Sequence, residues 1–394
     1  MRPALRSGAA FGLLALALTA CGSGDDGADG GSSSGSGSAA VASQPAPTGK
    51  VVETVDVAAT DTTCVPAETA LPAGVISFKL TNNGKEPTWL YVFRADRTVV
   101  SERANIAPGA TADLVVELPA GAYHVACKPN HEGDGIRQDI TVSGELAAEA
   151  DPRVTRAVDD YRAYIDEQVD DSIAKTEDFV AAVKKGDVKK AKDLYAPSRV
   201  GWERIEPVAE AFGDVDPKVD LREADLEEGA EWTGWHRLEK ALWKEPGTLK
   251  KEAKYGDRLL EDLDALKKKL PTAEITASSM ANGAKELLDE VATGKVTGEE
   301  EAFSHTDLWD FKANVDGAQK VYQLLTPIVM EKNPALVTTL DTEFAELNTL
   351  LGKYAEGDGF VAYTELSPEQ VKELADAVNA LAEPLSGLAA VVAG

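Results

Sequence analysis

A histidine and a glutamate three residues apart, His236 and Glu239, are the clearest candidates for chemistry in this chain of 394 residues. Side chains at positions i and i+3 of a helix lie on one face, with β-carbons about 5–6 Å apart. An imidazole and a carboxylate so placed can hold two coordination positions of one metal ion. Spacing alone favours a buried structural hydrogen bond between them, so the surroundings must decide.

Further acidic side chains lie around this pair in stretches that are predicted to be helical. Glu203 and Glu206 share a helical face, although Glu206 is equally suited to pairing with an arginine at the surface. Asp310 lies between two aromatic residues, where an unpaired acid is costly, while Asp307 also fits a helix capping box. Several carboxylates buried together require a neutralising cation, and with one imidazole they suit iron and tolerate zinc. The candidate ligands are His236, Glu239, Glu203, Asp310 and Asp307. Glu206 and His305 are open between a ligand role and a structural one. Tyr195 and Arg199 fit the edge of the site, although packing also explains the tyrosine and ion pairing the arginine.

Two kinds of hydrophobic periodicity predict the elements that must position these residues. Between residues 51 and 142 the period is two, and Gly, Pro and Asn punctuate the runs, which predicts a β-sandwich. The expected strands are 51–57, 75–80, 89–93, 112–118, 123–127 and 136–142. After Asp151 the period is about 3.6, which predicts an all-α helical bundle. Its helices are expected at about 154–185, 188–211, 234–245, 253–269, 274–292, 305–331, 334–355 and 367–392.

The N-terminus has the features of an export signal. Residues 1–20 contain a basic start and a short apolar core, and Leu18-Thr19-Ala20-Cys21 is typical of a bacterial lipobox, in which Cys21 receives lipid. The alternative is an ordinary secretory peptide. Residues 21–47, rich in Gly and Ser, predict a flexible tether. We therefore expect a β domain at 48–145 and a helical domain at 151–394, anchored by lipid to the outer face of the cell membrane, at the cell surface or in the periplasm.

The charge of the chain limits its partners. Its formal net charge at pH 7 is −27, which argues against nucleic acid, because phosphate binding requires a basic surface. A negative field instead attracts cations. Cys64 and Cys127 leave two alternatives open in an exported domain: a disulfide, or a metal site that uses one or both sulfurs. Cys127 precedes His131 as in a blue-copper loop, which makes copper an alternative metal, but the usual axial Met is missing.

The helical region carries a family resemblance. Its GxHxxE motif, formed by Gly234, His236 and Glu239, follows the Tyr-Ala-Pro-Ser-Arg sequence at 195–199 and precedes His-Thr-Asp-Leu-Trp-Asp-Phe at 305–311. Together these strongly resemble the imelysin-like domain of the EfeO-type iron uptake lipoproteins. The Ile-Ala-Pro-Gly sequence at 106–109 and the sequence at 118–127 resemble a cupredoxin domain.

This resemblance extends over about residues 48–392 and implies a function. It implies a monomeric extracytoplasmic protein that captures iron, Fe²⁺ or Fe³⁺, and delivers it to an EfeU-like membrane permease, in a system that includes an EfeB-like haem peroxidase. It also implies a β-domain site built from Cys64, Cys127 and the carboxylate of Glu102. Trp89 and Tyr91 depart from the family pattern, which has acids there.

Two enzymatic functions compete with a binding role. Imelysin-like domains have been classed with peptidases, but helical zinc peptidases use His-Glu-x-x-His, with two histidine ligands and a glutamate base. Here Arg237 follows His236, and Lys240 stands where the second histidine would be. A ferroxidase or electron-transfer role for the β domain would depend on Cys127 and an incomplete set of copper ligands. The sequence therefore favours a binding protein over an enzyme.

Overall fold

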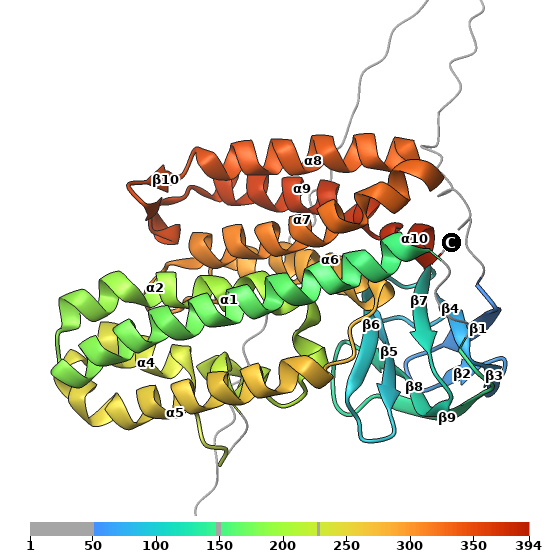
Figure 1. Ribbon diagram of the computed structural model, residues 1–394, viewed down its shortest axis with the longest axis horizontal. Coiled ribbons are helices and arrows are strands. Elements are labelled where there is room, and N and C mark those ends of the chain that lie inside the picture. Colours follow the sequence, from blue (N-terminus) through green and yellow to red (C-terminus); the bar gives the residue numbers. More distant parts are fainter. Residues whose placement is uncertain (1–50, 147–150, 227–228, 394) are drawn as a thin grey trace, which may run out of the picture. The chain divides into compact units, whose positions relative to one another are not determined.

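The computed structural model describes residues 51–146, 151–226 and 229–393, and Figure 1 shows its strands and helices. The predicted signal peptide, the tether and Cys21 lie outside the described residues, so the lipid anchor stays a prediction. Strands fill the first part of the described chain and helices most of the second, which confirms the predicted fold class. Within the described ranges, no helix combines the length and the apolar character needed to cross a membrane.

The β domain consists of two sheets that enclose an apolar core. One sheet has the strand order β2-β1-β4-β7 and the other β3-β9-β8-β5-β6. Alternate residues point inward, as in β1, and side chains from both sheets, including Val55, Phe78, Leu90 and Val125, form one buried cluster. The strands are β1 Glu53–Ala59, β2 Cys64–Pro66, β3 Ala70–Pro72, β4 Gly74–Asn82, β5 Thr88–Arg94, β6 Val99–Ile106, β7 Thr111–Leu118, β8 Gly121–Pro129 and β9 Ile136–Ser143.

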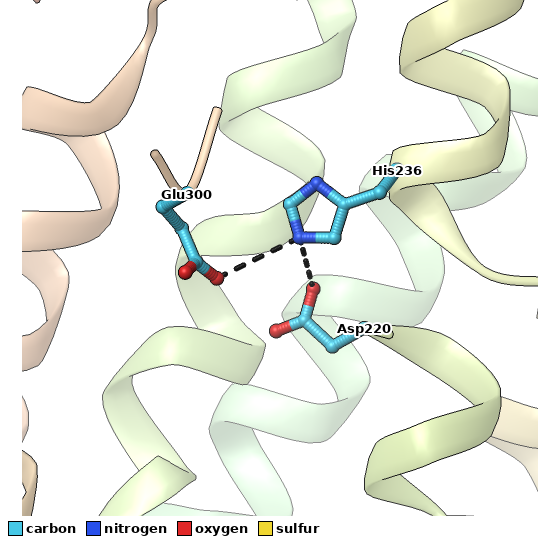
Figure 2. A group of neighbouring side chains, drawn as sticks. All are labelled: Asp220, His236 and Glu300. Atoms are coloured by element: carbon cyan, nitrogen blue, oxygen red, sulfur yellow. Dashed lines mark ion pairs between the residues drawn. The ribbon is translucent and has the colours of Figure 1, made fainter. Parts of the chain in front are cut away.

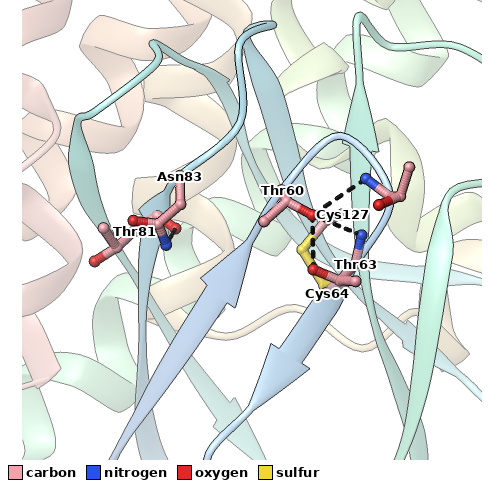
Figure 3. Close-up of a disulfide and its surroundings, with 7 residues drawn as sticks. Thr60, Thr63, Cys64, Thr81, Asn83 and Cys127 are labelled. Carbon is pink, nitrogen blue, oxygen red and sulfur yellow. Dashed lines mark hydrogen bonds between the residues drawn. A yellow bond between two sulfur atoms is a disulfide. The ribbon is translucent and has the colours of Figure 1, made fainter.

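A disulfide joins the two sheets. Cys64 on β2 is bonded to Cys127 on β8, and both side chains are buried (Figure 3). The turn before β2 is held by Thr60, whose hydroxyl accepts hydrogen bonds from the backbone N–H groups of Thr62 and Thr63. Of the two alternatives for these cysteines, the structure contains the disulfide. Their prediction as metal ligands is corrected accordingly, since sulfurs bonded to each other offer no thiolate.

The helical domain begins where the period of the sequence changes. Asp151 accepts the Arg153 N–H ahead of the first helix, and Gly186, in a left-handed conformation, ends it. The helices are α1 Pro152–Lys185, α2 Val188–Ile205, α3 Asp216–Val219, α4 Trp235–Trp243, α5 Leu249–Lys269, α6 Ala277–Thr293, α7 Asp307–Lys332, α8 Pro334–Gly352, α9 Pro368–Leu385 and α10 Leu388–Ala393. A short hairpin follows α8, and each of its strands has two residues: β10 Ala355–Glu356 and β11 Gly359–Phe360.

Two differences from the predicted helices affect the site. The helix expected to reach residue 211 ends at Ile205 and continues as a 3₁₀ segment, Glu206–Phe212, because Pro207 has no N–H to donate. The acidic connection expected at 213–229 contains the short helix α3 and a 3₁₀ turn, Glu223–Asp225. The described part of this connection therefore folds back into the domain, and Asp220 within it is buried.

Helix α2 packs unusually close to its neighbours α1 and α7, which run beside it in Figure 1. A β-carbon at Gly201 would lie 2.4 Å from the carbonyl oxygen of Gln168 on α1. One at Gly317 on α7 would lie 2.4 Å from the carbonyl oxygen of Arg204 on α2. Glycine is therefore required at both positions, and it brings the three backbones into direct contact around the middle of the domain.

Candidate metal centre

Three segments bring acidic side chains to one imidazole. His236 and Glu239 lie on α4, Asp220 directly follows α3, and Glu300 and Glu301 lie between a 3₁₀ turn, Lys295–Thr297, and α7. Gly234 makes this meeting possible, because it has φ = 85° and a β-carbon there would lie 2.2 Å from the Val219 carbonyl oxygen. The backbone contact places the residue after Val219, Asp220, next to His236.

One side of the imidazole faces two carboxylates. Nε2 of His236 lies 3.3 Å from Oδ1 of Asp220 and 3.6 Å from Oε1 of Glu300, and Figure 2 shows it pointing between them. The three side chains are only 2%, 5% and 9% exposed, in that order. Nε2 has no hydrogen-bond partner among the described residues. Ligand atoms about 3.4 Å apart are what a tetrahedral ion with bonds of about 2.1 Å requires.

The other side of the imidazole faces two further carboxylates, those of Glu239 and Glu301. Nδ1 of His236 lies 3.3 Å from Oε2 of Glu239 and 4.0 Å from Oε1 of Glu301. Oε1 of Glu239 accepts the backbone N–H groups of Phe303 at 2.9 Å and Ser304 at 2.6 Å. Glu239 is therefore stabilised by donors of the protein itself, as Asp220 is by Arg199 and by the indole N–H of Trp202. Its position resembles that of the carboxylates that orient a metal-bound imidazole through the second ring nitrogen.

The charge states distinguish Glu301 from the other carboxylates around the imidazole. Burial would raise the pKa of Asp220, but Arg199 and His236 hold it well below its usual range. Burial likewise opposes ionisation of Glu300, yet Lys295 and His236 lower its pKa to about 2. In Glu301, burial and the nearby Glu239 prevail and raise the pKa well above its usual value. The anionic carboxylates at Nε2 are thus ready for a cation, and Glu301 is not.

The surroundings of His236 favour its protonated form. Burial and Arg199 would lower the pKa of the imidazole, but the carboxylates of Asp220, Glu239 and Glu300 outweigh them and raise it well above its usual value. A proton on Nε2 then faces two anions without forming a hydrogen bond of good geometry. A divalent cation in this position would interact with both carboxylates more favourably than the proton does.

Arg199 and Lys295 neutralise the rest of the cluster. The Arg199 guanidinium is fully buried and forms ion pairs with carboxylates on several elements, namely Glu203, Asp220, Glu301 and Asp310. The Lys295 ammonium lies 3.1 Å from Glu203 and 2.8 Å from Glu206. Burial raises the pKa of Asp310 well above its usual value even with Arg199 beside it.

The ligands predicted from the sequence lie in different parts of this buried cluster. His236 and Glu239 are together as expected, whereas Glu203 and Asp310 belong to the same buried cluster but contact Arg199. Asp307 accepts the Glu301 N–H, and burial raises its pKa to about 6. The capping box that had offered an alternative explanation of Asp307 is absent, because α7 begins only at Asp307 and no side chain caps it.

The sequence did not single out Asp220, Glu300 or Glu301. Asp220 lies in the stretch that the sequence predicts to be an acidic connection, and Glu299 to Glu301 form a run of three acids ahead of α7. Such runs are ordinary in a chain with 67 acidic residues, and their signal was correspondingly weak.

The β-domain residues proposed as ligands are not brought together. Leu90 of β5 pairs with Cys127, whereas the next residue, Tyr91, pairs with Glu102 of β6. Successive side chains of a strand point to opposite faces, so Glu102 lies on the face opposite the disulfide. The Tyr91 hydroxyl is within 2.8 Å of His131 Nε2, and burial raises the pKa of Glu102 to about 8. A site of Cys64, Cys127 and Glu102 is therefore corrected as well.

Comparisons with known proteins match both domains. Residues 157–388 match the imelysin family model, and residues 36–142 match the cupredoxin-like domain. An Efem/EfeO family lipoprotein of Staphylococcus haemolyticus is 44% identical over 277 residues, which cover 70% of this chain and 96% of that protein. The iron uptake system component EfeO of Escherichia coli K12 is 37% identical over 346 residues, covering 86% and 92%.

The chain belongs to the EfeO family. As a family member it has a cupredoxin-like β region followed by a predominantly helical imelysin region. The fold is also similar to a crystal structure of an iron-regulated protein A precursor from Parabacteroides distasonis, with a TM-score of 0.50 at 17% identity, over 63% of this chain and 97% of that one. The candidate centre of this EfeO family member lies wholly within the imelysin match.

Proposed function

We propose that this protein is the iron-binding component of an extracytoplasmic iron uptake system, and that it holds the ion at Asp220, His236 and Glu300. One observation carries the proposal: a buried imidazole nitrogen without a hydrogen bond faces two ionised carboxylates at 3.3 and 3.6 Å. Two carboxylate oxygens and one imidazole nitrogen suit Fe²⁺, with water or a neighbouring acid completing the coordination. On binding, the ion replaces the proton of His236, and Glu239 keeps the ring oriented through Nδ1.

The names of the relatives support iron as the cargo. The Escherichia coli relatives are called components of an iron uptake system, and the staphylococcal relative is called a lipoprotein. We extend these properties to this chain: lipid on Cys21 holds it outside the membrane, iron passes to an EfeU-like permease, and an EfeB-like haem peroxidase acts in the same system. Delivery to a permease is a proposal that follows from the binding role.

Burial favours binding over peptidase chemistry. A metallopeptidase needs an open metal position that a polypeptide can reach, and a carboxylate free to activate water. Here the side chains of Asp220, His236 and Glu300 are at most 9% exposed, and Glu239 is held by two backbone N–H groups and His236. A small ion fits these conditions better than a peptide does.

Anaerobic titration with Fe²⁺, followed by calorimetry, tests the proposal. We expect the wild-type protein to bind one ion in the helical domain. Asp220→Asn and His236→Ala each remove a ligand, and we expect either change to weaken binding by about a hundredfold or more. A peptide-cleavage assay on the iron-loaded protein should show no activity.

The matched control is His124→Ala. His124 is a histidine of the β domain, paired with Asp139 at the surface. We expect His124→Ala to leave the affinity for Fe²⁺ unchanged. Wild-type affinity in His236→Ala, or an equal loss in His124→Ala, would reject the centre. Melting of the metal-free variants separates a lost ligand from a lost fold.

A further inference from the structure

Glu300 connects the buried centre to the surface. Its Oε1 faces inward, 3.6 Å from His236 Nε2 and 3.8 Å from the Arg199 guanidinium. Its Oε2 lies 3.6 Å from a guanidinium nitrogen of Arg222. The two oxygens of one carboxylate therefore contact groups of the buried cluster and a residue with access to solvent.

Arg222 covers this carboxylate without being held tightly to it. The side chain is 28% exposed and lies two residues after Asp220. Its shortest contact is with Asp225, from Nε to Oδ2 at 2.6 Å, and its contact with Glu299 is longer, at 3.2 Å. The pair with Glu300 is the longest of the three. The arginine can therefore leave Glu300 while it stays bound to Asp225.

The acids around Arg222 face solvent. Glu223, Asp225 and Glu299 are all about half exposed, with side-chain exposures of 42%, 47% and 53%. Carboxylates clustered at the surface raise the local concentration of cations. Arg222 lies among them and compensates part of their charge. An arriving ion would first meet these surface acids and then compete with Arg222 for Glu300.

We propose that the Arg222–Glu300 ion pair closes the route by which the metal ion enters and leaves the buried centre. This inference rests on the proposed function and adds the residue that governs exchange. The ion displaces Arg222 from the outer oxygen of Glu300, and Arg222 remains on Asp225 while the ion moves inward to Asp220 and His236. Arg222 is a positioning residue in this scheme and never a ligand.

Exchange kinetics test the proposal on the full-length protein. Release of Fe²⁺ into excess chelator and binding of added Fe²⁺ are measured by stopped flow, the latter through tryptophan fluorescence, to which Trp202 beside Asp220 contributes. In Arg222→Gln we expect both rates to rise about fivefold, with a smaller change in their ratio. Arg222→Lys keeps the charge but loses the planar fork, and it should accelerate release to an intermediate extent.

Lys240→Gln is the matched control. Lys240 pairs with the surface acid Glu223, so its loss changes the local charge equally without touching the pair on Glu300. An effect of charge alone would speed binding and slow release, because the site becomes more attractive to cations. We expect this pattern in Lys240→Gln and faster release in Arg222→Gln.

The release rates of the variants distinguish a failure of the proposed route from a failure of the proposed function. Faster release in Arg222→Gln but not in Lys240→Gln supports the route. Release from Arg222→Gln that is unchanged or slower than from the wild type overturns it and leaves the iron centre intact. A wild-type protein that binds no Fe²⁺ contradicts the proposed function itself.

Discussion

The two domains fill their interiors in opposite ways. Within residues 51–146, the buried polar residues are uncharged, namely Ser77, Asn82, Thr88 and Ser101, and a disulfide ties the sheets together. The helical domain instead buries an arginine, a lysine, a histidine and seven acids in one cluster: Arg199, Lys295, His236, Glu203, Asp220, Glu239, Glu300, Glu301, Asp307 and Asp310. Buried ions are a poor source of stability. The comparison therefore separates a region built for stability from one that sacrifices stability for binding.

Removal of Arg199 should have the largest effect. Arg199→Gln leaves four buried carboxylates with less compensation, and we expect the metal-free helical domain to lose about 3–5 kcal/mol. Added Fe²⁺ should restore more stability to this variant than it adds to the wild type, because the ion supplies the missing charge. Chemical denaturation with and without Fe²⁺ measures both. Arg204→Gln, which breaks a partly exposed pair with Asp316, should cost about 1 kcal/mol or less.

Removal of the disulfide should affect the other region alone. Replacing both Cys64 and Cys127 by Ser opens a cross-link over a sequence separation of 63 residues, and we expect a loss of about 3–4 kcal/mol in the β domain. Fe²⁺ affinity should stay at the wild-type value, because neither cysteine belongs to the helical centre. A loss of iron from the double variant would return the sulfurs to the set of candidate ligands.

A third prediction compares the two sides of His236. In Glu239→Gln, the amide oxygen can still accept the N–H groups of Phe303 and Ser304, but the negative charge at Nδ1 is lost. We expect an affinity for Fe²⁺ about tenfold weaker, against about a hundredfold for Asp220→Asn. The reverse order, measured by the same titration, would move the ion to the Nδ1 side of the ring.

The smallest effect concerns the pH dependence of the β domain. The pKa of Glu102 is about 8, raised by burial against the opposing hydrogen bond of Tyr91. A folded-state pKa above the unfolded value means that the folded protein binds the proton more tightly, so stability falls as the pH rises from about 5 to 8. Glu102→Gln should remove part of this fall, about 1 kcal/mol for a half-buried side chain. Glu68→Gln, at an exposed position, should leave the profile unchanged in melting curves across this range.

The sequence predicted those strands and helices whose apolar residues recur with a regular period. Alternation identified β1 and part of β8, and the 3.6-residue period identified α1 and the helix that carries His236 and Glu239. Strands β2 and β3 were missed because three residues are too few to establish a period. The eight-residue strand β6 was also missed, because its residues do not alternate between apolar and polar. The fold class followed because each domain keeps one period over many elements.

The ligand set was less accessible to sequence analysis, for a physical reason. Asp220 reaches His236 through a backbone contact at Gly234, and Glu300 reaches it from a segment without regular structure. Neither proximity depends on spacing along the chain. Arg199 is predicted from the sequence as an edge residue or as the partner of an acid. Its pair with Glu203 is an i,i+4 contact within α2, whereas its pair with Asp310 depends on the packing of α2 against α7, which no local pattern reports.

The glycine contacts of α2 have a consequence for engineering the centre. Because α2 touches α1 at Gly201 and α7 at Gly317 through backbone atoms, the spacing of these helices does not depend on how side chains repack. The acids of residues 299–301 are attached to a separate segment. Libraries that vary this segment should therefore alter metal preference on a fixed framework, whereas a single alanine at position 201 or 317 should disturb every acid of the cluster at once.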